Sequence, residues 1–164
     1  MNIEQTRHSL AHLLGAAVME LYLDAKLTLG PAVADGFYYD IAFTKPFSSD
    51  DLQKVEAKMR EILPSWKNVS HKEVSKEEAL QYYKGNEFKI ELINEISEKG
   101  EKITLYRQGN FIDLCRGPHG PSTRLVGKAF KLLKLAGAYW RGDSTQPMLQ
   151  RIYGTVWPTE KELN

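Results

Sequence analysis

The 164-residue sequence contains a single cysteine, Cys115, and this scarcity excludes a framework of intramolecular disulfides. One thiol in a chain of this length is typical of a reducing compartment, where the thiol is free to pack, bind a metal or react. The N-terminus also lacks the basic start, apolar stretch and small-residue cleavage site of a secretory signal. We therefore expect a cytoplasmic protein.

Long apolar runs, a large net charge and flexible linkers are missing as well. No apolar run approaches the roughly 20 residues that a membrane-spanning helix needs. The net charge of +1 gives no global attraction to nucleic acid, so contacts with phosphates require local clusters of Lys and Arg. With 42% hydrophobic and 26% charged residues, the composition is that of a globular domain. We expect one domain over residues 1–164, whose tail, 158–164, begins a linker to further parts.

The spacing of hydrophobic residues predicts helices in the first part of the chain and strands in the second. Turn signals around residues 29–43 indicate a hairpin between the first two helices. Helices are predicted over 6–23 and 52–62, after Ser75, and over 87–96; strands are predicted over 103–106, 111–114, 130–135, 138–141 and 149–155. This order favours an α+β fold with helices packed on a mainly antiparallel sheet.

Chemically active side chains gather in two short clusters. His8 and His12 are four residues apart on the first predicted helix, so both imidazoles leave the same side of it. In the second cluster, the alternation of a strand places Asp113 and Cys115 on one face, and His119 follows a Gly-Pro turn. Three of the four histidines and the only cysteine thus form the pair of motifs H-x-x-x-H and C-x-x-x-H. We interpret them as parts of one site.

Three chemistries can use this set of residues. The histidines and the cysteine can bind Zn²⁺, with a water in an open position as the hydrolytic group. Without a metal, a histidine with Asp113 can activate water for attack on an ester, while backbone N–H groups near Gly117 or a lysine stabilise the negative charge. A Cys115 nucleophile is less favoured, because an acyl-cysteine needs its own base and release step. The pattern alone leaves the first two alternatives open.

The motifs resemble the second additional domain, which is the editing domain, of bacterial-type threonyl-tRNA synthetases, and the resemblance covers nearly the whole chain. The two histidine and cysteine motifs also mark the wider superfamily that includes the alanyl-tRNA synthetase editing domain. Two long strings near the C-terminus are similar to the threonyl branch. The strings that carry the resemblance are Arg-His-Ser-Leu-Ala-His-Leu-Leu from Arg7, Gly36-Phe-Tyr-Tyr-Asp40, Asp113-Leu-Cys-Arg-Gly-Pro-His119, Ala136-Gly-Ala-Tyr-Trp-Arg-Gly-Asp-Ser144 and Met148-Leu-Gln-Arg-Ile-Tyr-Gly-Thr155.

The resemblance implies an aminoacyl-tRNA ester hydrolase that removes serine from threonine tRNA. Its partners are then the 3′ end of that tRNA and the remainder of a synthetase, with no membrane involved. It also implies a site without an obligatory cofactor, with zinc on His8, His12, Cys115 and His119 as the alternative. The implied catalytic residues are His8, His12, Lys89, Asp113, Cys115 and His119, and the implied substrate-binding residues are Tyr38, Arg116 and Gly117.

Serine is threonine without its methyl group, a difference worth only about 1 to 3 kcal/mol in a synthetic pocket. An editing pocket can instead exclude threonine by a clash with that methyl group. A basic rim of lysines and arginines in the C-terminal half is a candidate contact for the tRNA: Arg116, Arg124, Lys128, Lys131, Lys134, Arg141 and Arg151. Two alternative functions are a non-catalytic tRNA- or zinc-binding module and an alanyl-type deacylase that acts in trans.

Overall fold

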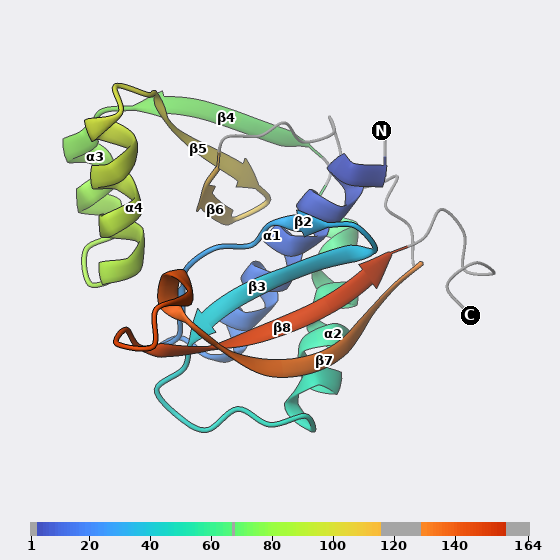
Figure 1. The fold of residues 1–164 in the computed structure, drawn as a ribbon. Helices are drawn as coiled ribbons and strands as arrows, with labels where there is room; N and C mark the ends of the chain where they lie inside the picture. Colours follow the sequence, from blue (N-terminus) through green and yellow to red (C-terminus); the bar gives the residue numbers. More distant parts are fainter. Residues whose placement is uncertain (1–2, 67, 116–128, 157–164) are drawn as a thin grey trace.

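The described residues of the computed structural model are 3–66, 68–115 and 129–156. They form four α-helices and two antiparallel sheets, arranged as Figure 1 shows. None of the helices in this part of the chain is long and apolar enough to cross a membrane.

The larger sheet has five strands, with the order β1-β3-β8-β7 and with β2 also paired to β3. Every pair is antiparallel, and β3 and β8 pair from Gly36 opposite Thr155 to Ile41 opposite Gln150. A β-bulge between Leu132 and Lys134 shifts the register of the pair β7 and β8. The strands are β1 (Lys26–Leu27), β2 (Ala32–Val33), β3 (Gly36–Ala42), β7 (Phe130–Tyr139) and β8 (Met148–Val156).

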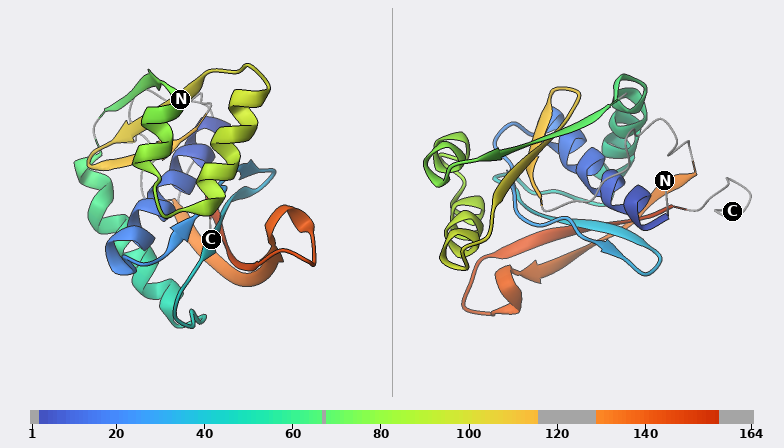
Figure 2. Two further views of the ribbon diagram at one scale, coloured as in Figure 1. Left: turned by 90° about the vertical axis from the view of Figure 1, so that its left-hand side faces the viewer. Right: turned by 90° about the horizontal axis from the view of Figure 1, so that it is seen from above.

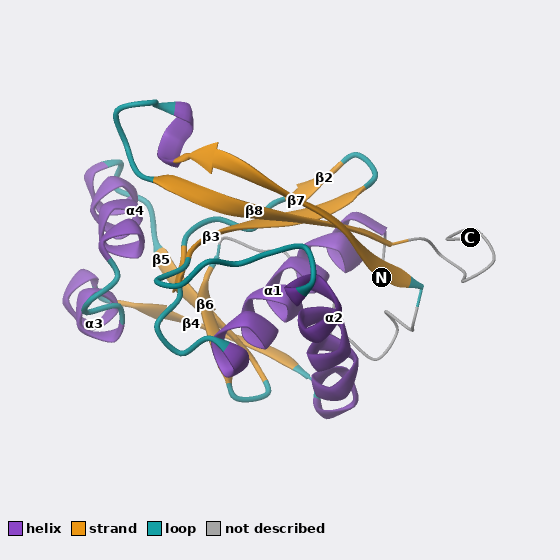
Figure 3. Cartoon of the chain, turned by 90° about the horizontal axis from the view of Figure 1, so that it is seen from below, coloured by secondary structure: helices purple, strands orange, loops and turns teal. Residues whose placement is uncertain are grey.

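One face of the larger sheet is covered by the helices α1 (Ile3–Leu21) and α2 (Asp51–Ile62) (Figure 3). Alternation along β3 turns Phe37, Tyr39 and Ile41 toward these helices, where all three side chains are buried. Their contacts with the apolar residues of both helices form the main hydrophobic core.

The smaller sheet has the order β4-β5-β6, formed by Val69–Val74, Ile103–Gln108 and Phe111–Leu114. Two helices accompany it, α3 (Lys76–Tyr82) and α4 (Glu87–Glu98), and both begin at a capping side chain. The Ser75 hydroxyl accepts a hydrogen bond from the backbone N–H of Glu78, and the side-chain oxygen Oδ1 of Asn86 accepts two from N–H groups in the first turn of α4. Helix α1 lies between the two sheets (Figure 2), and its Gly15 faces Tyr39 of the larger sheet and Phe111 of the smaller one.

The structure confirms the predicted α+β class and the predicted helices, with boundary shifts of a few residues at several ends. Several details differ from the prediction, and the strands form two sheets rather than one. The strands predicted over 130–135 and 138–141 are joined in one strand, β7, because pairing with β8 continues through the weakly strand-forming Ala136 and Gly137. This strand ends at Tyr139, and Trp140–Gly142 form a short 3-10 helix instead. The polar strand β4 was not predicted, because only Val74 among its residues is buried and the others give no hydrophobic alternation.

Candidate active site

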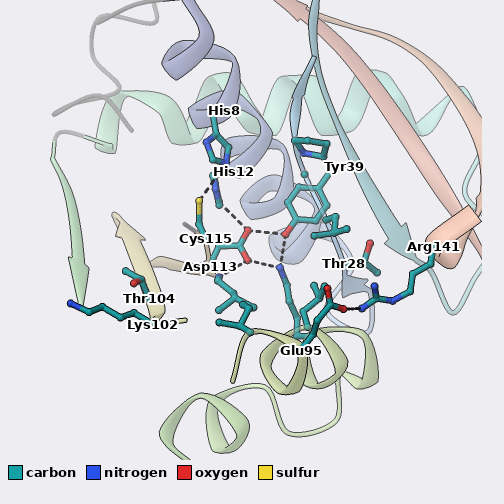
Figure 4. A pocket seen from close by; sticks show the side chains of 17 residues that line it. His8, His12, Thr28, Tyr39, Glu95, Lys102, Thr104, Asp113, Cys115 and Arg141 are labelled. Carbon is teal, nitrogen blue, oxygen red and sulfur yellow. Dashed lines mark hydrogen bonds and ion pairs between the residues drawn. The ribbon is translucent and has the colours of Figure 1, made fainter. Parts of the chain in front are cut away.

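A cavity of about 430 Å³ lies where α1, β3, α4 and the end of β6 meet (Figure 4). This volume is within the range of small-molecule sites, about 300 to 1,000 Å³. Residues 28–31, which connect β1 to β2, form one wall, and α4 forms another. The cavity is therefore built from segments that are far apart in the sequence.

The buried carboxylate of Asp113 is the centre of the polar side of this cavity. Its Oδ1 accepts a hydrogen bond of 2.8 Å from Lys89 Nζ, and its Oδ2 accepts one of 2.7 Å from the hydroxyl of Tyr39. His12 Nδ1 lies 2.9 Å from the same Oδ2. Lys89 Nζ also donates to the Tyr39 hydroxyl at 3.1 Å, which closes a network of four side chains.

Lys89 reaches this network from the first turn of α4, two residues after the helix begins at Glu87. Asn86 caps the helix and its side-chain amide donates to the carbonyl of Leu27, so the N-terminus of α4 is attached to the larger sheet. The side chain of Lys89 is only 2% exposed. A lysine this deeply buried needs a charged partner, and Asp113 provides it.

The charges of neighbouring groups shift the pKa values of Asp113 and His12 in opposite directions. Burial alone raises the pKa of Asp113, but Lys89 and His12 hold that pKa well below its ordinary range. Burial alone lowers the pKa of His12, but the Asp113 carboxylate raises it to about 9. The pair therefore favours an ionised Asp113 and a protonated His12, the form of an imidazole that can donate a proton.

His8 and Cys115 form a second polar pair next to the network. The Cys115 sulfur lies 3.3 Å from His8 Nε2, and the centroids of the His8 and His12 rings are 5.1 Å apart. Both residues are only partly buried, whereas His12 and Asp113 are fully buried. His8 is thus the histidine that a substrate in the cavity meets first.

The same residues have the chemistry of a metal site. The ligand atoms of His8, His12 and Cys115 all lie within 4.8 Å of one another. Imidazole nitrogen and thiolate sulfur suit zinc, and a carboxylate on the second ring nitrogen, as Asp113 provides for His12, is the usual support of a metal-binding histidine. The donor set therefore fits zinc, and it equally fits a hydrolytic site without a metal.

The tyrosine at the site is Tyr39 rather than Tyr38, which the sequence analysis favoured. Successive residues of a strand point to opposite faces, so Tyr39 enters the network while Tyr38 lies on the other face, against Tyr153 and Arg151. A β-carbon on Gly30 would lie 2.4 Å from the Tyr39 ring. The absence of a side chain at this position therefore leaves room for the ring.

Among the predicted site residues, the structure brings five together: His8, His12, Lys89, Asp113 and Cys115. Arg116, Gly117 and His119 lie outside the described residues. Tyr83 was not predicted, although its hydroxyl accepts the backbone N–H of Leu114 at 2.9 Å and contacts Asp113 Oδ1 at 3.4 Å. Its position after α3 carries no motif, so no sequence signal indicated this contact.

Comparison with known proteins places the chain in a family. Residues 103–153 match the family model described as the threonyl and alanyl tRNA synthetase second additional domain. The chain is also similar to threonine–tRNA ligases: 53% identical over 163 residues to that of Hyphomonas neptunium and 57% identical over 157 residues to that of Rubrobacter xylanophilus. These matches cover 98% and 96% of the chain but only 25% and 24% of the relatives.

The chain belongs to the family of second additional domains of threonyl and alanyl tRNA synthetases. Within that family it is of the threonyl-tRNA synthetase type, as the resemblance predicted, because its relatives over nearly its whole length are threonine–tRNA ligases. The chain spans about a quarter of the length of these relatives. His8, His12 and Lys89 lie outside residues 103–153, but within the segment that is similar to the ligases.

Proposed function

We propose that this chain is a post-transfer editing hydrolase that removes serine from the 3′ end of threonine tRNA in the cytoplasm. The observation that carries the proposal is that Lys89, Asp113 and His12 share one cavity with the pair His8 and Cys115. A buried ion pair that serves stability alone does not need a ligand-sized cavity beside it.

The cavity suits an aminoacyl ester of a nucleoside. Apolar side chains, among them Leu29, Pro31 and Leu92, form one part of its lining, and the polar network forms the other. The terminal adenosine fits the apolar part and the seryl group the polar part, because the reacting ester must lie near the proton donors. The hydroxyl and amine of serine then find hydrogen-bond partners among His8, Cys115 and the network.

Hydrolysis needs a base for water and a proton donor for the leaving oxygen. Asp113 is engaged by its side-chain donors and His12 favours the protonated form, so His8 is the base that we propose. Water attacks the ester carbonyl carbon and gives a proton to His8. The bond between this carbon and the ribose oxygen then breaks, His12 protonates that oxygen, and serine and uncharged tRNA are released.

Lys89 and Asp113 act through position and charge in this scheme. Asp113 holds His12 in the protonated form and orients its ring, while Lys89 balances the buried carboxylate. If zinc binds His8, His12 and Cys115, it would activate a water molecule by lowering its pKa. A bound metal would leave the attachment of Asp113 to Lys89 and Tyr39 in place.

The test is hydrolysis of seryl and threonyl esters of 3′-adenosine and of threonine tRNA by this chain. We expect rapid loss of serine with threonine spared, and a loss of rate of about 100-fold or more in His8→Ala or Asp113→Asn. His71→Ala is the matched control, because His71 lies exposed on β4 and does not line the cavity. Equal rates for the two esters would contradict steric exclusion of threonine.

Chelation and the choice of tRNA separate the alternatives. Activity that survives a chelator supports the mechanism without a metal, whereas activity that zinc restores after chelation assigns His8, His12 and Cys115 as ligands. No hydrolysis under either condition would support the non-catalytic binding module. A strong preference for alanine tRNA that is mischarged with serine would support the alanyl-type deacylase.

A further inference from the structure

The larger sheet has an outer face, opposite α1 and α2, that carries aromatic and basic side chains. Figure 1 looks onto this face, and Figure 3 shows α1 and α2 on the other side. The register of the strands places Tyr38 opposite Tyr153, and Tyr153 opposite Lys134. Asp40 and Arg151 form the next row along the same two strands.

The side chains of these rows contact one another. The Tyr38 and Tyr153 rings have centroids 5.7 Å apart. The Arg151 guanidinium lies 4.1 Å from the centroid of Tyr38, and Lys134 Nζ lies 4.8 Å from that of Tyr153. Asp40 holds Arg151 through two hydrogen bonds of 2.7 and 2.8 Å, so the plane of the guanidinium is fixed over the Tyr38 ring.

The charge of this face is positive. Strands β3, β7 and β8 contain three cationic residues, Lys131, Lys134 and Arg151, and one carboxylate, Asp40. The carboxylate is engaged by Arg151, while both lysines are exposed. Proteins that bind single-stranded nucleic acids combine such side chains. Lysines contact the phosphates, and aromatic rings and arginine guanidinium planes stack on the bases.

We propose that this tyrosine–lysine face, formed by Tyr38, Lys131, Lys134, Arg151 and Tyr153, binds the unpaired RNA strand that leads to the cavity. The proposal rests on the editing function proposed above, which supplies an RNA with a single-stranded 3′ end. The lysines contact phosphates, and the tyrosine rings and the Arg151 plane stack on bases.

The position of the face relative to the cavity supports this assignment. Strand β7 carries both lysines and continues to Tyr139, and Arg141, two residues further, lines the cavity (Figure 4). A strand of RNA that follows β7 therefore arrives at the side of the cavity that Arg141 and Glu95 form. A protein partner is a poorer match, because the cores of protein interfaces are depleted of charged residues, and lysine in particular.

The experiment measures by fluorescence anisotropy how tightly the full 164-residue chain binds threonine tRNA that carries no amino acid. The same tRNA without its unpaired 3′ nucleotides is measured in parallel, and both are measured over a range of salt concentrations. The test variant is Lys131→Ala with Lys134→Ala. The control is Lys54→Ala with Lys72→Ala, which removes the same charge from two side chains that are each 73% exposed on other elements. Hydrolysis of the seryl ester of 3′-adenosine is measured in parallel.

We expect the test variant to bind intact tRNA about tenfold more weakly and to lower the slope of log affinity against log salt by about 2, one for each lost phosphate contact. The control variant should bind intact tRNA as the unmodified chain does, the lysine substitutions should not change the binding of the trimmed tRNA, and hydrolysis of the small ester should stay the same. Equal slopes in the test and control variants, or no binding of tRNA by the unmodified chain, would overturn the proposal.

The two proposals fail in different ways. If the small ester is hydrolysed but the lysine substitutions leave tRNA binding unchanged, the editing function stands and the tyrosine–lysine face has another occupant. If the small ester is not hydrolysed but the salt slope falls as expected, the face binds RNA and the proposed chemistry is wrong. Tyr153→Ala adds a test of stacking, with an expected loss of affinity of about fivefold or more.

Discussion

The Asp113 carboxylate is surrounded by hydrogen-bond donors from four different segments of the chain, and these donors determine its position in the site. Lys89 comes from α4, Tyr39 from β3, His12 from α1 and Tyr83 from the turn after α3. An ionised carboxylate this deeply buried is stable only when it is paired and hydrogen-bonded. The position of each donor therefore affects both folding and the proposed chemistry.

Tyr83 offers a test at the scale of single residues. Removing its hydroxyl in Tyr83→Phe takes a hydrogen bond from the backbone of Leu114 and a contact from Asp113, both on the strand that carries the site. We expect the free energy of unfolding to fall by about 1 kcal/mol. We also expect kcat for the seryl ester to fall several-fold with KM unchanged, because Asp113 is less well positioned.

Tyr82→Phe is the matched control for this prediction. Tyr82 is the adjacent tyrosine, its ring packs edge-on against that of Tyr83, and it is 48% exposed. Urea unfolding and steady-state kinetics on both variants give the comparison. If kcat fell equally in the two variants, Tyr83 would have no specific role in positioning Asp113.

At the scale of elements, the strand pair β3 and β8 needs glycine where the chains approach most closely. Phe37 pairs with Gly154, and a β-carbon on Gly154 would lie 2.3 Å from the Phe37 ring. Phe37 is fully buried in the main core, so its ring has little room to move. This close packing keeps β3, and with it Tyr39, in place.

We therefore predict that Gly154→Ala lowers the free energy of unfolding by about 1 to 3 kcal/mol, as expected for overpacking of a core. Gly137→Ala in β7 is the control, because its new β-carbon would meet only the flexible side chain of Met148, which is 54% exposed. Urea denaturation midpoints measure the difference. A loss in Gly137→Ala as large as in Gly154→Ala would contradict this explanation.

At the scale of the whole molecule, the geometry of the cavity depends on how α4 is attached to the larger sheet. Trp140, directly after β7, packs edge-on against Phe88 of α4 and donates its ring N–H to Glu91. Arg141 pairs with Glu95 on the same helix. These contacts, together with the hydrogen bond from the Asn86 side chain to the carbonyl of Leu27, attach α4 to the larger sheet. They therefore fix the position of Lys89 relative to the cavity.

Trp140→Ala should therefore destabilise the protein by about 3 to 5 kcal/mol, because Trp140 is only 4% exposed. We expect amide hydrogen exchange to accelerate more in α4 than in α2, since α4 loses the packing of Phe88 on Trp140 and the hydrogen bond to Glu91. Tyr139→Ala is the control, because this neighbouring aromatic residue is 40% exposed. Equal acceleration in both helices would show that Trp140 stabilises the molecule as a whole rather than the attachment of α4.

Much of the architecture was predictable from local patterns, since the periods of helices and strands and the capping residues are local properties of the chain. The motifs also located His8, His12, Asp113 and Cys115, because helical and strand spacing place each pair on one face. Lys89 was predicted only through the family resemblance. Nothing around it in the sequence indicates that an exposed-looking lysine of an amphipathic helix becomes buried.

The tertiary structure alone decided which residues meet. The sequence determined the α+β class and the two histidine and cysteine motifs, because each depends on residues a few positions apart. The choice of Tyr39 over Tyr38, the contact of Tyr83 with Asp113 and the pairing of Lys89 with Asp113 depend on segments up to 74 residues apart. Such contacts are set by the packing of sheets and helices around α1, and no spacing within one segment encodes them.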